Sequence, residues 1–296
     1  MNCGLRINEL SYNVIAYTDD LLLISATVTG LQRMIDHANT YVCENGLSFN
    51  ASKTKCVIYG KCYLDPKPTW NLSGNILNQC DSLDYLGATL SSNGTSDHKD
   101  RCITSCRSRY FALQNAGLHR HGVRPSIAAY LWNTAIQPAL MYANESMALR
   151  SSHVLHMDML QAKLVKNSLG FSKYLRSTAL LNALDIKKLN KLIPINSLKL
   201  FNSIMQGTSR SRHFYNHVIK NCGAKDNNLF ARCQKFCSSH NVSLLNLTIN
   251  VQSCKSFCKS FISQPINDGF TDSVSMLLRN FTPHDQDLIK LLLSPF

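Results

Sequence analysis

Short apolar runs separated by turn residues characterise the first quarter of the chain. Residues 3–25 predict β structure, in which an apolar strand at Asn13–Ala16 and a second at Leu21–Ser25 flank a tight turn. Thr29, with Gln32 three residues later, has the pattern of a helix N-cap and capping box. We therefore expect a hairpin followed by a helix that begins at Thr29.

Apolar positions then recur at helical spacing as far as Asn45-Gly46, which ends the predicted helix. Strand character follows at Cys56–Tyr59 and Leu83–Leu90. Between them, the Pro- and Asn-rich residues 61–80 predict a loop with a short hairpin, and Ser91–Gly94 predicts a turn.

The pattern becomes helical after residue 95. The apolar stripes predict helices at Ser96–Gly117, Pro125–Met141, His153–Leu169 and Lys187–Met205, whereas the residues from about 210 onward are poorly patterned. The order β-α-β-β followed by helices predicts an α+β fold, in which a small sheet with a packed helix precedes a helical domain.

Two adjacent carboxylates, Asp19 and Asp20, occupy the first predicted turn. On a continuous strand their side chains would point to opposite faces, but a turn allows both to gather near one point. Adjacent carboxylate oxygens suit Mg²⁺, which proteins hold through one or two carboxylates together with substrate phosphates. The alternative is a pair of solvated turn residues.

The chain is basic and its charge is uneven. Among 296 residues, 31 Lys and Arg face 18 Asp and Glu, a formal net charge of +13. No acidic residue occurs from Arg101 to Asn144, where five arginines accumulate: Arg101, Arg107, Arg109, Arg120 and Arg124. This excess favours a polyanionic partner such as nucleic acid, and a basic protein without such a partner is the alternative.

Twelve cysteines occur at irregular spacing, and Met1–Gly4 lack the basic start of a signal peptide, so we expect reduced thiols in an intracellular protein. Three pairs, 102/106, 233/237 and 254/258, have three intervening residues rather than the two typical of zinc sites, which favours buried thiols over zinc. The longest apolar runs are too short to cross a bilayer.

Five segments of the chain, in order, resemble motifs of a polymerase. Tyr17-Thr18-Asp19-Asp20 resembles the Tyr-x-Asp-Asp box of the polymerase palm. The similar downstream segments are Gly46–Lys55 (Gly-Leu-x-x-Asn-x-x-Lys-Thr-Lys), Leu83–Gly87 (the primer-grip hairpin), Ile136–Glu145 (Pro-x-Leu-x-Tyr-Gly-x-Glu) and Leu164–Gly170. Together they resemble the reverse transcriptase of non-LTR (LINE-type) retrotransposons, over residues 1 to about 190.

The resemblance implies a domain plan and a set of site residues. Residues 1–95 would form a partial palm, 96–209 a helical thumb-like domain and 210–296 a C-terminal extension of unknown role. Asp19 and Asp20 would bind Mg²⁺ for two-metal nucleotidyl transfer. The other expected site residues are Lys53 and Lys55 near the departing pyrophosphate, Tyr17, Tyr85, Leu86 and Gly87 near the primer, and Arg101, Arg107 and Arg109 along the nucleic-acid backbone.

Each of these roles has a plain structural alternative. Tyr17 could simply pack in its hairpin, the two lysines could be solvated, and the segment at Tyr85 could be a core hairpin. The arginines of the 96–117 segment do not share one helical face, which favours a diffuse electrostatic contact or a solvated basic helix.

The family places a further essential aspartate on an earlier palm strand, but the only acidic residue before Asp19 is Glu9. We therefore expect a C-terminal part of a reverse transcriptase with little or no polymerase activity alone. We also expect an open sheet edge that makes the chain poorly soluble unless a partner chain or the C-terminal tail covers it. The implied partners are an RNA template and a DNA primer, with no membrane, and the implied location is nuclear. The alternatives are a non-catalytic nucleic-acid-binding module and an unrelated helical interaction protein.

Overall fold

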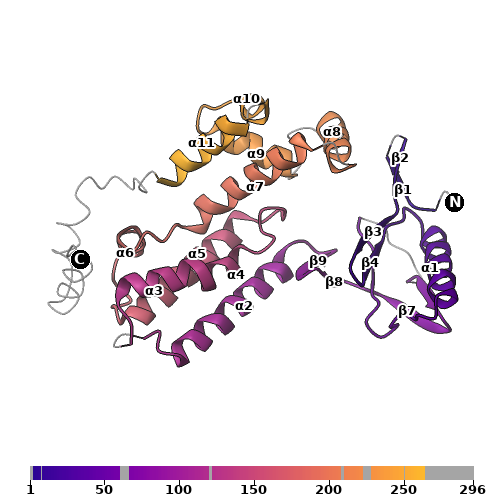
Figure 1. The fold of residues 1–296 in the computed structure, drawn as a ribbon, viewed down its shortest axis with the longest axis horizontal. Helices are drawn as coiled ribbons and strands as arrows, with labels where there is room; N and C mark the ends of the chain where they lie inside the picture. Colours follow the sequence, from indigo (N-terminus) through magenta and orange to yellow (C-terminus); the bar gives the residue numbers. More distant parts are fainter. Residues whose placement is uncertain are drawn as a thin grey trace. The chain divides into compact units, whose positions relative to one another are not determined.

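The computed structural model describes residues 3–7, 9–60, 67–119, 122–207, 210–222, 228–249 and 251–263. The contacts divide the chain into two compact units, Met1–His98 with Ser209–Val218, and Lys99–Thr208 with Ile219–Phe296. The first contains every described strand, and most helices belong to the second (Figure 1). The architecture is therefore a mixture of small sheets and helices, compatible with the expected α+β class.

Hairpins dominate the first unit. β1 (Leu5–Ile7) pairs with β2 (Leu10–Tyr12), β3 (Val14–Tyr17) with β4 (Asp20–Leu23), and β8 (Ser82–Tyr85) with β9 (Ala88–Ser91), all antiparallel. β5 (Cys56–Val57), β7 (Asn75–Cys80) and β6 (Thr69–Leu72) form a three-stranded sheet in that order. β5 runs parallel to β7, and β6 runs antiparallel to it. The hairpin expected within 61–80 is confirmed as β6–β7, whereas residues 61–66 lie outside the described residues.

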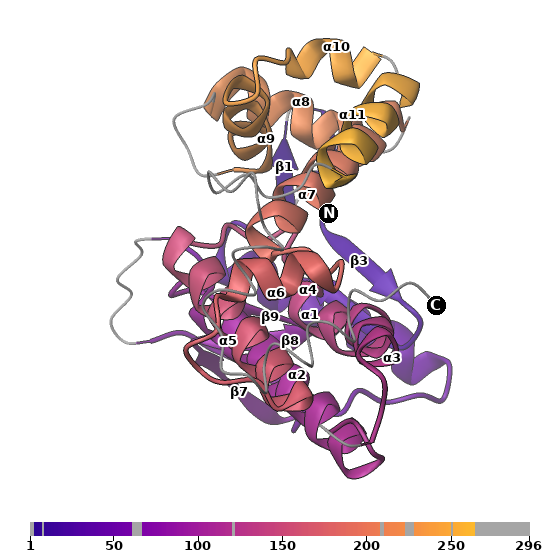
Figure 2. The ribbon, with the colours of Figure 1, turned by 90° about the vertical axis from the view of Figure 1, so that its left-hand side faces the viewer.

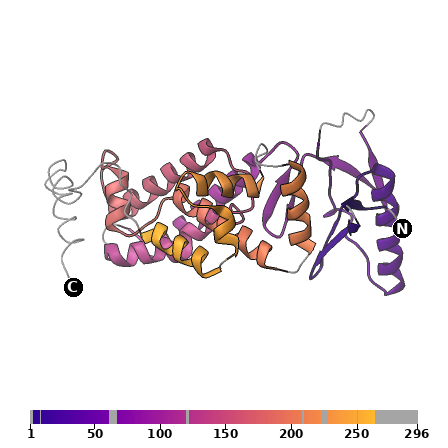
Figure 3. The same cartoon turned by 90° about the horizontal axis from the view of Figure 1, so that it is seen from above.

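Helix α1 (Val28–Glu44) packs against β6, and it lies beside the strands in the view from above (Figure 3). The indole Nε1 of Trp70 donates to the carbonyl oxygen of Val28 at 3.2 Å. Around this contact, a small core buries Ile35, Cys56, Trp70, Leu72 and Leu77.

The predicted N-cap of α1 at Thr29 is wrong, because Thr27 caps the helix. The Oγ1 atom of Thr27 accepts a hydrogen bond from the amide of Gly30 at 3.0 Å. Gln32 does not complete a capping box, since its side-chain amide pairs with the backbone N–H and carbonyl of Asn71 on β6, both at 2.8 Å. The predicted end at Asn45-Gly46 is confirmed, with Asn45 as C-cap and Gly46 at a φ of 70°.

The second unit is helical. Its N-terminal helices are α2 (Ser96–Asn115), α3 (Pro125–Leu131), the π-helical segment η1 (Trp132–Ile136), α4 (Gln137–Met141), α5 (Ser151–Leu169), α6 (Ser177–Ala183) and α7 (Leu189–Gln206). The expected stripe of α2 is confirmed, since Ile103, Cys106 and Tyr110 are buried. Gly170 ends α5 at a φ of 68°, as its position after Leu169 predicted. The short helix α6 was not predicted.

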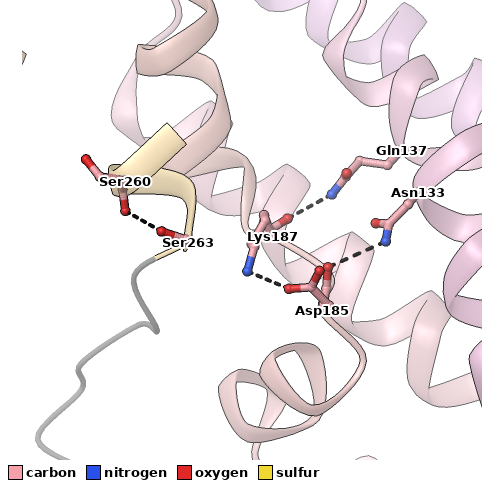
Figure 4. Close-up of polar contacts among 6 residues, drawn as sticks. All are labelled: Asn133, Gln137, Asp185, Lys187, Ser260 and Ser263. Atoms are coloured by element: carbon pink, nitrogen blue, oxygen red, sulfur yellow. Dashed lines mark hydrogen bonds and ion pairs between the residues drawn. The ribbon is translucent and has the colours of Figure 1, made fainter. Parts of the chain in front are cut away.

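A polar network joins α5 to η1, to α4 and to the segment just before α7. Gln161 accepts hydrogen bonds from the Trp132 indole at 3.2 Å and from Gln137 at 2.8 Å, and Gln137 also donates to the carbonyl of Lys187 at 2.8 Å (Figure 4). The buried carboxylate of Asp158 accepts the amides of Leu189 and Asn190 at 2.6 and 3.2 Å and so caps α7. Burial raises the pKa of Asp158, and these two hydrogen bonds oppose that shift.

Helices also fill the described residues beyond 210, where none was predicted from the sequence. They are α8 (Arg210–Cys222), α9 (Leu229–Ser238), α10 (Leu244–Ile249) and α11 (Val251–Ser263). Helices α9, α10 and α11 pack against α7 (Figure 2), where the rings of Phe201 and Phe230 lie 5.9 Å apart. Pro194 lies inside α7 between its two ends. No helix in the described ranges is long and apolar enough to cross a membrane.

Candidate functional site

The β3–β4 hairpin places the two adjacent carboxylates at a turn. Tyr17 pairs with Asp20 across the ladder, so Thr18 and Asp19 form the two-residue connection and Asp20 is the first residue of β4. The predicted turn between two apolar strands is therefore confirmed. Asp19 and Asp20 are both exposed, so their oxygens are open to a ligand.

The turn carries backbone strain at Thr18, whose φ is 50°. A β-branched residue in the left-handed region is rare, because its side chain crowds the following carbonyl at a cost of roughly 1–2 kcal/mol. Such strain persists where the surrounding structure holds it, and it is concentrated at functional sites. The strained residue lies directly beside Asp19, which makes this turn the strongest candidate site in the first unit.

The strands that carry the turn are uncovered. Val14 is 51% exposed, Ile15 50% and Tyr17 61%, although Val14 and Ile15 lie on opposite faces of β3. Only the far end of β4 reaches the core, where Leu23 packs near α1. The alternative reading of Tyr17 as a packed aromatic is therefore wrong, because its ring stands in solvent.

Asp19 and Asp20 fit one Mg²⁺ whose remaining ligands are waters and substrate phosphates. They do not fit a pair of cations. The described residues contain no group of three or more His, Cys, Asp or Glu placed to hold a metal ion. Glu9 lies in the turn between β1 and β2, which is a different hairpin from the one that carries Asp19.

Lys53 and Lys55 lie in the loop before β5. Asn50 shapes this loop, because its side-chain oxygen accepts from the amide of Ser52 at 3.0 Å and from that of Lys53 at 3.3 Å. Both lysines are exposed, and within the described ranges no hydrogen bond or ion pair joins either one to Asp19 or Asp20. The structure therefore does not bring the lysines and the carboxylates into contact.

The segment that resembles the primer grip is a tight hairpin. Tyr85 pairs with Ala88, which leaves Leu86 at a φ of 49° and Gly87 at a φ of 78° as the turn. Two successive positive φ values are the requirement of the type I′ hairpin turn, and Gly87 meets it without a Cβ penalty. Leu86 is 39% exposed, and the Tyr85 hydroxyl is buried without a hydrogen-bond partner.

The three candidate arginines of α2 have different surroundings. Arg109 donates through Nη1 to the carbonyl of Ala135 at 3.0 Å, so its head group is anchored on the π-helical segment. Arg101 is exposed. Arg107 lines a cleft of about 710 Å³ between α2 and α5, together with Lys163.

The cleft was missed by sequence reasoning. Its α2 wall is formed by residues 107, 110, 111 and 114, and its α5 wall by residues 160, 163, 164 and 167. Both sets follow the spacing i, i+3, i+4 and i+7, which places each on one helical face. The spacing is visible in the sequence and indicates one face on each helix, but nothing in the sequence shows that the two faces meet.

The three cysteine pairs behave as the buried thiols that were expected. Cysteines 102/106, 233/237 and 254/258 are free and buried, whereas Cys43 is exposed and Cys80 is half-buried. Burial raises the pKa of Cys106 and of Cys233 to about 12, so both stay protonated at neutral pH. Cys258 differs, since a hydrogen bond from Cys254 lowers its pKa to about 7.

Comparisons of the chain with protein-family models, with curated proteins and with solved structures found no match.

Proposed function

We propose that this chain carries the Asp-Asp turn of an RNA-directed DNA polymerase of the non-LTR retrotransposon kind. The observation that supports the proposal is the exposed, strained turn at Thr18-Asp19-Asp20, beside the exposed ring of Tyr17. Two-metal nucleotidyl transfer needs carboxylates that reach the cations, and an exposed pair at a turn can supply part of that ligand set.

In the proposed site, Asp19 and Asp20 hold Mg²⁺, which neutralises charge on the reacting phosphates when it is bound. Tyr17 lies beside the primer end, and Lys53 or Lys55 meets the departing pyrophosphate. The β8–β9 turn at Leu86 and Gly87 contacts the primer backbone. The partners are an RNA template and a DNA primer, and the place of action is chromosomal DNA in the nucleus.

The proposed site is incomplete in this chain by itself, because two cations need more carboxylates than one turn supplies. The purified chain should therefore extend a primed RNA template little or not at all. Primer extension that Asp19→Ala abolishes would contradict this part of the proposal and would show that the missing ligands are present.

Metal binding by the turn can be tested without activity. Mn²⁺ also prefers carboxylate oxygens, and its unpaired electrons broaden nearby amide resonances. We expect Mn²⁺ to broaden the amide signals of Thr18 and Asp19, and the double change Asp19→Asn with Asp20→Asn to remove that broadening. Asp81→Asn, at an exposed residue outside the turn, is the control. Broadening that persists in the double variant would contradict the proposal.

A non-catalytic nucleic-acid-binding module is the second candidate, and the acid-free stretch from Arg101 to Asn144 favours it. Binding that rests on phosphate contacts weakens steeply when salt rises from about 50 to 200 mM. RNA binding that is insensitive to salt, or absent at low salt, would count against this candidate.

A further inference from the structure

The cleft between α2 and α5 is lined by two helical faces of similar chemistry, each with one cation, one amide and two apolar or aromatic side chains. Its volume of about 710 Å³ lies in the range of small-molecule sites. The buried side chains of Leu160, Leu164 and Phe171 form apolar parts of its wall, and polar groups stand among them. The cleft thus combines an apolar surface with separate hydrogen-bonding groups.

Its charge is entirely positive. Arg107 and Lys163 are exposed, and within the described part of the chain no hydrogen bond or ion pair engages either head group. No carboxylate lines the cleft. The nearest carboxylate in sequence on α5, Asp158, is buried and already accepts two backbone amides. Two cations without a counter-charge attract an anion.

A tyrosine whose buried hydroxyl has no hydrogen-bond partner also lines the cleft. Tyr110 is 1% exposed, and its hydroxyl has no hydrogen-bond partner. Burial raises the pKa of this phenol, so the hydroxyl stays protonated and acts as a donor. Buried polar groups nearly always have partners, and a bound water or ligand is one way in which an exception is completed.

An exposed aromatic ring stands beside the ring of Tyr110. Phe111 is 53% exposed and meets the Tyr110 ring edge-on, with centroids 5.3 Å apart. Its open face can stack on a planar base, as aromatic residues do in single-strand binding proteins. The amides of Gln114 and Asn167, also in the lining, can hydrogen-bond to base edges.

We propose that this cleft binds a nucleotide unit of a single-stranded nucleic acid. Arg107 and Lys163 contact phosphate, Phe111 stacks on the base, and the Tyr110 hydroxyl donates to an oxygen of the strand. A purely apolar ligand would leave both cations and the hydroxyl unpaired. The inference rests on the proposed function for its class of partner, but it uses residues that the Asp19–Asp20 turn does not.

The first test measures binding of the full chain to a fluorescent single-stranded RNA of about 12 nucleotides by anisotropy. The double change Arg107→Gln with Lys163→Gln should weaken binding at least about tenfold at low salt and reduce the salt slope by about 2. The control removes the same charge from exposed residues elsewhere in the unit, through Arg150→Gln with Lys255→Gln. It should change affinity about twofold or less.

Tyr110→Phe separates binding from folding. Because the hydroxyl has no partner among the described protein atoms, its removal should leave the melting temperature unchanged or higher. The affinity for RNA should nevertheless fall about threefold or more, since a hydrogen bond to the strand is lost. Phe111→Ala should weaken binding about tenfold through the loss of stacking. An unchanged affinity in both variants would overturn the proposal.

Two competitors identify the ligand. Adenosine monophosphate should compete only weakly, because it offers a single phosphate and base. Equal affinity for the free nucleotide and the strand would overturn the strand as ligand. Polyglutamate that competes as well as RNA, and independently of Phe111, would assign the cleft to acidic peptides. If the unaltered chain binds no RNA while Mn²⁺ still broadens the Asp19 amide, this inference fails and the metal proposal stands.

Discussion

The β3–β4 hairpin and helix α5 use apolar residues in opposite ways. Every residue of β3 is exposed, including Val14 and Ile15, whereas α5 buries Met157, Leu160 and Leu164 in the main core. The hairpin also holds a strained turn, while α5 ends in an unstrained glycine cap. The difference indicates that α5 and its neighbours supply stability and that the hairpin is arranged to contact something else.

The largest expected effect lies in the helical core, at Trp132. Its side chain is 1% exposed and donates to Gln161, so Trp132→Ala removes packing and a buried hydrogen bond. The free energy of unfolding should fall by about 3–5 kcal/mol, measured by urea denaturation. Tyr130→Ala, at a residue 67% exposed on the neighbouring α3, should change it by about 0.5 kcal/mol or less. Equal losses in the two variants would contradict the assignment of the core.

A smaller effect of opposite sign is expected at Thr18. Thr18→Gly relieves the strain of the positive φ but adds backbone freedom to the unfolded chain, so we expect a net gain of about 0.5–1 kcal/mol. The same change at Thr40, an exposed residue inside α1, should cost up to about 0.5 kcal/mol. Both are measured by denaturation. A lower free energy of unfolding in the Thr18→Gly variant would show that the backbone at Thr18 is not strained.

The smallest effect on stability is expected on the hairpin surface. Ile15→Lys should change the free energy of unfolding by about 0.5 kcal/mol or less, because Ile15 is already half exposed. It should nevertheless shift the chain towards the monomer in sedimentation, since a lysine on an open strand opposes edge pairing. Ile127→Lys, at a residue 47% exposed on α3, is the control and should leave association unchanged. If the unaltered chain is already a monomer, the hairpin needs no partner chain to cover it, and the expectation of such a partner is contradicted.

The sequence predicted elements whose signals are local. The turn at Asp19, the stripe of α2 and the glycine cap at Gly170 each follow from residues within one element. The N-cap of α1 could not be chosen this way, because Thr27 and Thr29 are both good caps and Gln32 is taken by Asn71 of a distant strand. Tertiary contacts decided between them.

The same limit applies to the candidate sites. The Asp19–Asp20 pair is contiguous, so its pattern was visible in the chain. The cleft depends on two helical faces that are separated by some fifty residues, and on a hydroxyl whose lack of a partner only the packed structure reveals. The π-helical segment also makes a tertiary contact that the sequence does not show, since Arg109 of α2 donates to its Ala135 carbonyl.

Pro194 interrupts the hydrogen bonding of α7. Since proline has no amide hydrogen, the carbonyl of Asn190 lacks its usual donor within α7. Leu189 and Ile193, on one side of this gap, belong to the core around α5, and Phe201, on the other side, packs against α9. The missing hydrogen bond therefore marks the boundary, within one helix, between the residues that join the main core and those that carry the C-terminal helices.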